Sequence, residues 1–316
     1  MEKVLGLAPL HGVTNYIFRN VYFKYFEWID YAVTPFIAAV KKLEGTKHVK
    51  DILPENNNLK KIIPQIMGNT SETIIPFSKF IQTLGYDEID WNLGCPFPMV
   101  ANKQRGSGLL PFPDRIDGIL YDFFSKTDMK ISLKIRLGRR SEDEIFDLID
   151  VFNKYPIDKI IIHPRTGIQM YDGTVNLEVF SKVYKLLKAN IVYNGDINTR
   201  GNYLELKGRF PEIKEWMIGR GAVGNPFLAA EIKGVFVDEF TKRVTLKEYH
   251  SELLFSYQNY LSGDKHLLDK MKEVWSYNSE LFKRRADIKL KIKRAHNIDS
   301  FKDTIREIFA EYEFIS

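Results

Sequence analysis

The stretch "ISLKIRLGRRSEDEIFDLIDVFNKYPIDKIIIHPRT" (residues 131–166) decides the fold, because it holds two strand-like runs with a helix-like segment between them. The runs 131–138 and 159–166 are short, apolar and rich in isoleucine, which is typical of strands in a parallel sheet. Residues 141–155 begin with Ser141 and acidic residues, a pattern that predicts an amphipathic helix with an N-terminal cap. This order predicts a parallel sheet whose outer face is covered by helices.

The same unit recurs along the first two thirds of the chain. Each apolar run is separated from the next by enough residues for a helix, and eight units in about 220 residues fit a (β/α)8 TIM barrel. A doubly wound parallel sheet is the alternative architecture. The runs are "VLGLAPL" (4–10), "YAVTPFI" (31–37), "KIIPQIM" (61–67), "EIDWNLG" (88–94), "ISLKIRLG" (131–138), "KIIIHPRT" (159–166), "IVYNGDI" (191–197) and "EWMIGRG" (215–221).

After about residue 240 the strand-like runs stop and the pattern becomes helical. The segment "TLKEYHSELLFSYQNYLSG" begins with Thr245 and Glu248 at the spacing of a capping box, which predicts a helix starting there. Further helical patterns follow to the end. We therefore predict a barrel catalytic domain over 1–240 and a small C-terminal α-helical bundle domain over 241–316.

The composition is that of an ordinary soluble globular protein. Of the 316 residues, 44% are hydrophobic and 28% are charged, and no apolar run approaches the roughly 18 residues that a membrane span needs. The single cysteine excludes an internal disulfide, CxxC redox chemistry and cysteine-based zinc sites. We expect a cytoplasmic monomer without a metal, and the net charge of +5 permits an anionic partner.

Polar, glycine or proline residues stand at almost every predicted strand exit, where a barrel builds its active site. Each of these residues alone has an ordinary structural explanation, but their convergence on one rim indicates a functional site. They are Ala8, Pro9 and Leu10 after the first strand, Gln65 in the third, Asn92 and Cys95 after the fourth, Lys134 and Arg136 in the fifth, His163 and Arg165 in the sixth, Asn194, Gly195 and Asp196 in the seventh, and Gly219 and Arg220 in the eighth.

The last two exits, "NGDI" (194–197) and "IGRGAVGNPF" (218–227), predict a phosphate site, since barrels bind phosphate after strands seven and eight. Their glycines permit close backbone approach, and Arg220 can pair with a phosphate. Lys134 could stabilise negative charge on a reduced flavin ring, and Gln65 could bond its heteroatoms. Flavin mononucleotide (FMN) is the simplest single ligand for both ends.

Six blocks in this order resemble the tRNA-dihydrouridine synthase family over essentially the whole chain. The opening block is similar to the family's "APM-x-GVTD-x-x-FR", and the cysteine block to its "N-x-GCP…V…G-x-x-L". The helix-like segment "MKEVWSYNSELF" is similar to the family's RNA-binding domain. The blocks are "LAPLHGVTNYIFR" (7–19), "WNLGCPFPMVANKQRGSGLL" (91–110), "SLKIRLG" (132–138), "IIHPRTGIQMYDG" (161–173), "YNGDI" (193–197) and "MIGRGAVGNPF" (217–227).

The resemblance implies FMN-dependent reduction of the C5=C6 bond of a uridine in tRNA, driven by NADPH or NADH. Hydride would pass from N5 of FMN to C6, and Cys95 would act as a general acid that protonates C5. The target base would have to leave the folded tRNA to reach the pocket. The basic stretch 283–294, with seven basic residues and one acidic residue, would contact RNA phosphates. The implied FMN-binding residues are Ala8, Pro9, Leu10, Gln65, Lys134, His163, Asn194, Gly195, Asp196, Gly219 and Arg220, and the implied substrate-binding residues are Asn92, Lys103, Arg105, Arg136 and Arg165.

The chain departs from the family pattern at a few positions, including Pro164 after His163 and the hydrophobic run 97–99 after the cysteine. Three other functions stay open on the residues alone. One is a flavin barrel reductase of a free small molecule, and another is a tRNA-binding protein without redox activity. The third is an aldolase-like barrel in which Lys134 forms a Schiff base.

Overall fold

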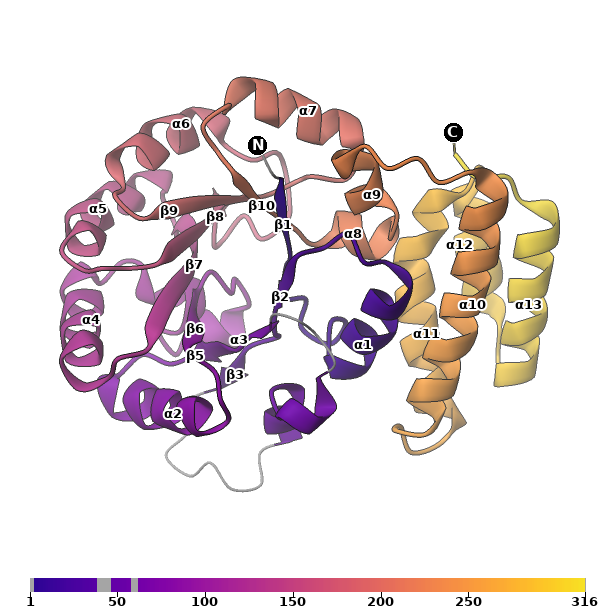
Figure 1. Ribbon diagram of the computed structural model, residues 1–316, viewed down its shortest axis with the longest axis horizontal. Coiled ribbons are helices and arrows are strands. Elements are labelled where there is room, and N and C mark those ends of the chain that lie inside the picture. The colour runs from indigo at the N-terminus through magenta and orange to yellow at the C-terminus, as the bar shows by residue number, and fades with distance from the viewer. Residues whose placement is uncertain (1–2, 39–46, 58–61, 316) are drawn as a thin grey trace.

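The computed structural model describes residues 3–38, 47–57 and 62–315, which form a barrel with a group of four helices packed against one side (Figure 1). The strands curl around one centre and most helices lie outside them, as the alternation of apolar runs and amphipathic segments predicts. None of the helices in these residues is long and apolar enough to pass through a bilayer.

All strand pairs are parallel, and the ladder closes on itself. The hydrogen-bonded order is β3-β5-β6-β7-β8-β9-β10-β1-β2-β4, and its two ends are halves of interrupted strands. Only Pro64, which has no N–H to donate to a ladder, separates β4 from β5, and residues 34–36 separate β2 from β3. Because β2 pairs with β4 and β3 pairs with β5, each interrupted pair forms one strand, and the ten segments make eight barrel strands. The TIM barrel is confirmed. The strands are β1 (Val4–Leu7), β2 (Tyr31–Val33), β3 (Ile37–Ala38), β4 (Ile62–Ile63), β5 (Gln65–Met67), β6 (Glu88–Leu93), β7 (Lys130–Gly138), β8 (Lys159–Thr166), β9 (Asn190–Asn194) and β10 (Glu215–Ile218).

Helices follow the strands and bury their apolar faces against them. The predicted N-terminal cap at Ser141 is confirmed, because its side chain accepts from the backbone N–H of Asp143 and Glu144 completes a capping box. The capped turn is a 3₁₀ helix (Glu142–Ile145), and the α-helix follows it directly from Phe146. The helices of the barrel are α1 (Tyr16–Tyr25), α2 (Ser71–Thr83), α3 (Pro98–Ala101), α4 (Pro113–Lys126), α5 (Phe146–Asn153), α6 (Leu177–Leu186), α7 (Arg200–Arg209), α8 (Arg220–Gly224) and α9 (Leu228–Lys233).

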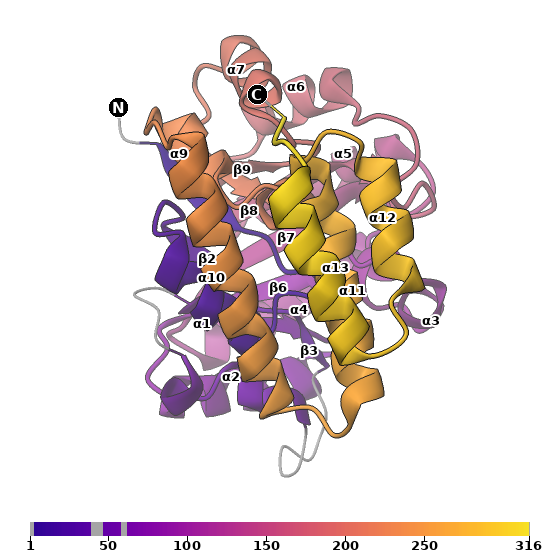
Figure 2. The ribbon, with the colours of Figure 1, turned by 90° about the vertical axis from the view of Figure 1, so that its right-hand side faces the viewer.

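The C-terminal region consists of α10 (Glu239–Gln258), α11 (Asp264–Asn278), α12 (Arg285–Arg294) and α13 (Ile298–Glu311), which face the viewer in Figure 2. The predicted helix start at Thr245 is wrong. The helix begins six residues earlier, because the carboxylate of Asp238 accepts from the N–H of Thr241 and caps it there.

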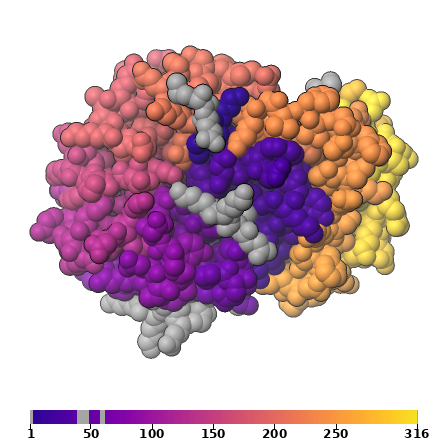
Figure 3. Space-filling model, viewed as in Figure 1, coloured from indigo at the N-terminus to yellow at the C-terminus, as the bar shows by residue number. Residues whose placement is uncertain are grey.

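Helix α10 joins this region to the barrel by packing on α1, and the two regions form adjoining surfaces in Figure 3. The buried side chains of both belong to one continuous hydrophobic cluster. Several polar contacts cross the junction, and two of them involve buried side chains of the helical region. The hydroxyl of Tyr257 donates to Oδ1 of Asn15 over 2.9 Å, and Nδ2 of Asn278 donates to the carbonyl of Val223 over 2.6 Å. The division at residue 240 stays a prediction.

Candidate active site

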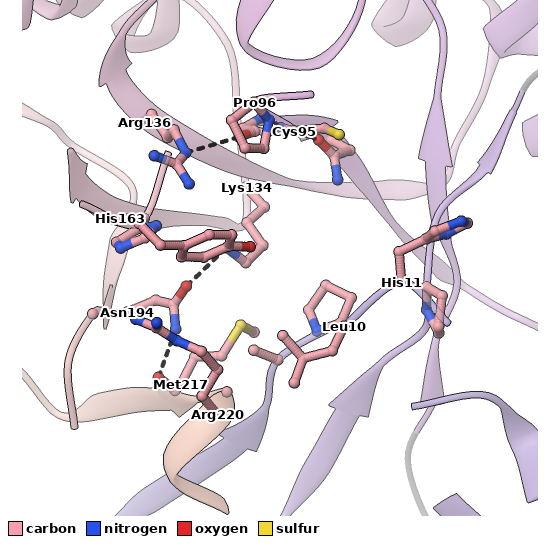
Figure 4. A pocket seen from close by; sticks show the side chains of 18 of the residues that line it. Leu10, His11, Cys95, Pro96, Lys134, Arg136, His163, Asn194, Met217 and Arg220 are labelled. Carbon is pink, nitrogen blue, oxygen red and sulfur yellow. Dashed lines mark hydrogen bonds between the residues drawn. The ribbon is translucent and has the colours of Figure 1, made fainter. Parts of the chain in front are cut away.

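A cavity of about 900 Å³, counting the space open to solvent, lies at the carboxyl ends of the strands. All the predicted site residues except Lys103, Arg105 and Arg165 line it. In Figure 4, Cys95 and Arg136 lie on one side, Arg220 lies on the opposite side, and Lys134 lies between them. Residues that are more than 120 positions apart in sequence therefore share one site, as convergence of parallel strand ends requires.

Cys95 stands on a tightly held loop after β6. Its backbone N–H donates to Oδ1 of Asn92 over 2.9 Å, and its carbonyl accepts from the hydroxyl of Ser107 over 2.9 Å. Gly106, with φ of +55°, lies so close that a Cβ there would come within 2.8 Å of the Cβ of Cys95. The thiol is buried, and burial raises the pKa of Cys95, so the site holds a protonated thiol at neutral pH.

The side chain of Asn92 lines the pocket and also forms hydrogen bonds inside the barrel. Its Nδ2 donates to Oε1 of Gln65 over 2.8 Å, and its Oδ1 also accepts from the N–H of Gly94. Gln65 in turn donates from Nε2 to Oδ2 of Asp90 over 2.7 Å. Asp90 is fully buried beneath the pocket and also accepts from Oγ of Ser132. The amide of Asn92 is therefore engaged in holding the cysteine loop.

Lys134 enters the cavity from β7 and donates to Oδ1 of Asn194 over 2.8 Å. Asn194 is oriented by its own Nδ2, which donates to the carbonyl of Met217 over 2.8 Å. Burial and the neighbouring charge of Arg136 lower the pKa of Lys134. Because only one hydrogen of the ammonium is used by Asn194, the others can meet a ligand in the cavity.

Arg136 is almost fully buried and braces the loop after β8. Its Nε donates to the carbonyl of Gly94, and its Nη1 donates to the carbonyls of Thr166 and Met170. The guanidinium also lies 5.4 Å from the ring centre of Tyr171. Arg136 therefore ties the cysteine loop to the loop after the neighbouring strand β8 and places a positive charge at the pocket wall.

Arg165 lies behind the lining and supports it. Its Nη1 and Nη2 pair with Oδ1 and Oδ2 of Asp196 over 2.9 and 2.7 Å, and Nη1 lies 3.0 Å from Nε2 of His163. Burial and the surrounding cations lower the pKa of His163 well below its ordinary value, so this ring is neutral. Arg220 also contacts Asp196, over 3.3 Å, from the exposed side of the pocket.

Lys103 and Arg105 lie on the loop that follows α3, outside the lining. Sequence reasoning missed Tyr171, which lies between Arg136 and Arg220 with its ring centre 4.8 Å from the guanidinium of Arg220. It also missed His11, whose ring stacks on that of Phe36 with the ring centres 5.0 Å apart. Tyr171 and His11 lie inside the quoted blocks 161–173 and 7–19, so the family resemblance already marked the segments that contain them. No group of three or more potential metal ligands occurs within the described ranges.

Solved structures share this fold. The chain superposes on an old yellow enzyme homologue from Zymomonas mobilis with a TM-score of 0.50 and 10% identity, covering 74% of this chain and 89% of that one. It also superposes on a DHODH from Eimeria tenella in complex with ferulenol, with a TM-score of 0.52 and 14% identity, covering 73% and 79%. At such identities the likeness shows the barrel fold alone.

Residues 6–313 match the family model described as Dihydrouridine synthase (Dus), and the chain belongs to that family. A tRNA-dihydrouridine(16) synthase of Aquipseudomonas alcaligenes is 25% identical over 80% of this chain and 82% of its own length. A tRNA-dihydrouridine synthase B of Vibrio vulnificus is 28% identical over 73% of this chain and 71% of its own length. The family expected from the sequence blocks is confirmed.

Proposed function

We propose that this protein reduces the C5=C6 bond of a uridine in tRNA, with FMN bound in the pocket and NADPH or NADH as the reductant. The observation that carries the proposal is the buried, protonated thiol of Cys95 at one side of a cavity whose other side offers Arg220. Family membership supports the reaction, and the names of the relatives support tRNA as the substrate.

The donors of the pocket fit FMN at both of its ends. Gly195, Gly219 and Arg220 offer backbone approach and a guanidinium for a phosphate. Across the cavity, Lys134 and the second Nε2 hydrogen of Gln65 can meet polar atoms of a flavin ring. When bound and reduced, FMN would supply the hydride for C6 of the uracil.

The chain's own residues then complete the reduction. Negative charge left on the uracil is stabilised by the cations of Lys134 and Arg136, of which Arg136 is almost fully buried. Cys95 donates its proton to C5, and its raised pKa keeps that proton available at neutral pH. The loop contacts from Asn92 and Ser107 hold the thiol in place for this transfer.

The test is turnover of unmodified tRNA transcript by the flavin-loaded protein with NADPH, followed by mapping of dihydrouridine at each position. Cys95→Ala should lower the rate by about 10²–10⁴, the usual contribution of a positioned general acid. Free uridine is assayed in parallel. Reduction of free uridine with none on tRNA would contradict the proposal and establish a small-molecule reductase.

The tRNA contact is proposed for the exposed end of α12. Within the basic stretch, Arg285 and Lys289 pair with Glu280, and Lys291 pairs with Glu307, so much of its charge is already offset. Replacing both exposed residues at the helix end should weaken tRNA binding and lower the slope of log K against log salt by about 1–2, because each phosphate contact contributes about 0.9. These variants are Lys293→Gln and Arg294→Gln, and the matched pair on the distant α6 is Lys182→Gln and Lys185→Gln.

Equal slopes for the two pairs of variants would remove α12 from the RNA surface. Binding is measured by filter retention or anisotropy over a range of salt concentrations, because a single affinity does not separate phosphate contacts from other losses.

A further inference from the structure

Asp90 is a fully buried carboxylate beneath the pocket, and the proposed reaction does not use it. Both of its oxygens accept hydrogen bonds. Oδ1 accepts from Oγ of Ser132 over 3.0 Å, and Oδ2 accepts from Nε2 of Gln65 over 2.7 Å. Burial raises the pKa of Asp90 to about 7, although the hydrogen bonds from Gln65 and Ser132 favour its ionised form. A buried charge without a direct ion-pair partner is costly, so the bonds that hold it point to a role in the site above it.

Hydrogen bonds link Asp90 to the Cys95 loop through Gln65 and then Asn92, and in each amide the NH₂ group faces Asp90 and the oxygen faces the loop. Gln65 presents Oε1 to Nδ2 of Asn92 over 2.8 Å, and Asn92 presents Oδ1 to the N–H of Cys95 over 2.9 Å. Above a pH of about 7 the carboxylate of Asp90 is ionised and only accepts, whereas each amide has a donor end and an acceptor end. Asp90 therefore fixes which way Gln65 points, and Gln65 fixes which way Asn92 points.

We propose that Asp90 is a positioning residue that holds the Cys95 loop through the amides of Gln65 and Asn92. Reversal of Asn92 would turn its NH₂ group toward the N–H of Cys95 and release the loop from below, and reversal of Gln65 would set its NH₂ group against that of Asn92. The catalytic consequence rests on the proposed function, but the anchoring itself does not. Because Cys95 is the only cysteine of the chain, the rate at which iodoacetamide alkylates the flavin-free protein reports this one loop.

The decisive variants reverse the polarity of the bonds. Asn92→Asp places an acceptor where Gln65 also presents an acceptor, and Gln65 cannot turn without facing Asp90 with its oxygen. This conflict should raise the alkylation rate of Cys95 by about tenfold, the factor that one lost buried hydrogen bond produces. Adding Asp90→Asn resolves the conflict, because the new amide at position 90 can donate to the turned Gln65, and Gln65 can then donate to the new carboxylate at position 92.

The doubly substituted protein Asp90→Asn with Asn92→Asp should therefore return to within about twofold of the parent rate. Asp90→Leu with Asn92→Asp is the matched control, since it removes the same charge and offers no donor. It should stay about as fast as Asn92→Asp alone. Alkylation is followed from pH 8 to 10, where Asp90 is ionised, and the pH dependence separates access to the thiol from changes in the thiol pKa.

Equal rescue by the Leu and Asn replacements would overturn the proposal in favour of simple charge repulsion, and a parent-like rate in Asn92→Asp would overturn it outright. If these variants do not fold, Gln65→Met in the otherwise unchanged chain cuts the same path, and a parent-like alkylation rate there overturns the proposal too. On tRNA, kcat should fall in the variants whose alkylation rate rises and should recover in the doubly substituted protein Asp90→Asn with Asn92→Asp. Alkylation in the expected order with no tRNA reduction by the parent would support the anchoring and contradict the proposed function.

Discussion

The barrel mouth, which is the cavity at the carboxyl ends of the strands, and the C-terminal helical region each bury a histidine. The two rings differ in their hydrogen-bond partners and in the charges around them. Burial and four nearby cations lower the pKa of His163, whereas burial alone lowers the pKa of His250 to about 3. Nε2 of His163 lies 3.0 Å from Nη1 of Arg165. Both ring nitrogens of His250 lack a hydrogen-bond partner within the described residues.

The surroundings of the two rings repeat this contrast. His250 stacks on Trp275 at 4.4 Å, and Nε1 of Trp275 is also buried without a partner in the described ranges. In the same ranges, no side chain lining the pocket has such an unpartnered buried atom. Polar groups at the mouth therefore depend on one another, and removing one leaves its neighbour without a hydrogen-bond partner. The unpartnered ring nitrogens of His250 lower the free energy of unfolding, and an apolar side chain at this position would remove that cost.

The largest effect is expected from Arg165→Met at the mouth. It leaves Asp196 without its bidentate partner, and the two side chains of this ion pair are 2% and 28% exposed. Removing one partner of such a pair should lower the free energy of unfolding by about 3 kcal/mol. The matched control is Arg209→Met, which breaks the exposed pair with Glu178 and should cost less than about 1 kcal/mol.

Urea unfolding of both variants measures this difference. Similar losses in Arg165→Met and Arg209→Met would show that the mouth does not depend on the buried pair, and the contrast between the two regions would lose its main support.

A smaller effect is expected from Gly106→Ala in the cysteine loop. The residue has φ of +55°, and its new Cβ would lie 2.8 Å from both Cβ and the carbonyl oxygen of Cys95. Gly234→Ala is the control, because Gly234 has φ of +83° and no atom within 4 Å of the new Cβ. The left-handed backbone alone costs about 1 kcal/mol, so Gly234→Ala should lose that amount and Gly106→Ala about 2 kcal/mol. Equal losses would mean that the loop yields freely around Cys95.

The sequence predicts the barrel and the pocket lining for one physical reason. Parallel strands end at the same edge, so polar residues after apolar runs had to converge, and Gln65, Lys134 and Asn194 do so. Local signals were less reliable where another residue competed for the same role. Thr245 has the spacing of a cap, but Asp238 caps the helix first.

The support behind the lining could not be predicted from the sequence. Asp90 stands in a strand that reads as apolar, and its partners Gln65 and Ser132 come from the two neighbouring strands. Arg165 was expected in the lining, but its bidentate bond to Asp196 draws it behind the pocket. Such roles depend on register and side-chain direction across strands, which a linear pattern does not contain.

At neutral pH the smallest effect is expected from His250→Phe. Folded His250 stays neutral down to about pH 3, whereas the unfolded residue takes up a proton near its ordinary pKa of about 6.5. Between these values the unfolded state holds the extra proton. Its contribution to stability is thus complete above about pH 6.5 and declines by about 1.4 kcal/mol per pH unit as the pH falls.

Replacing His250 with Phe removes that slope while keeping an aromatic ring against Trp275. At pH 7 the free energy of unfolding should change by less than about 1 kcal/mol, and at pH 5 the variant should be more stable than the parent by about 2 kcal/mol. Urea titrations from pH 4.5 to 7 measure both curves. The buried His163 titrates identically in parent and variant, so their difference isolates His250. Parallel curves would show that an unseen partner satisfies the ring, and the contrast with the mouth would then fail.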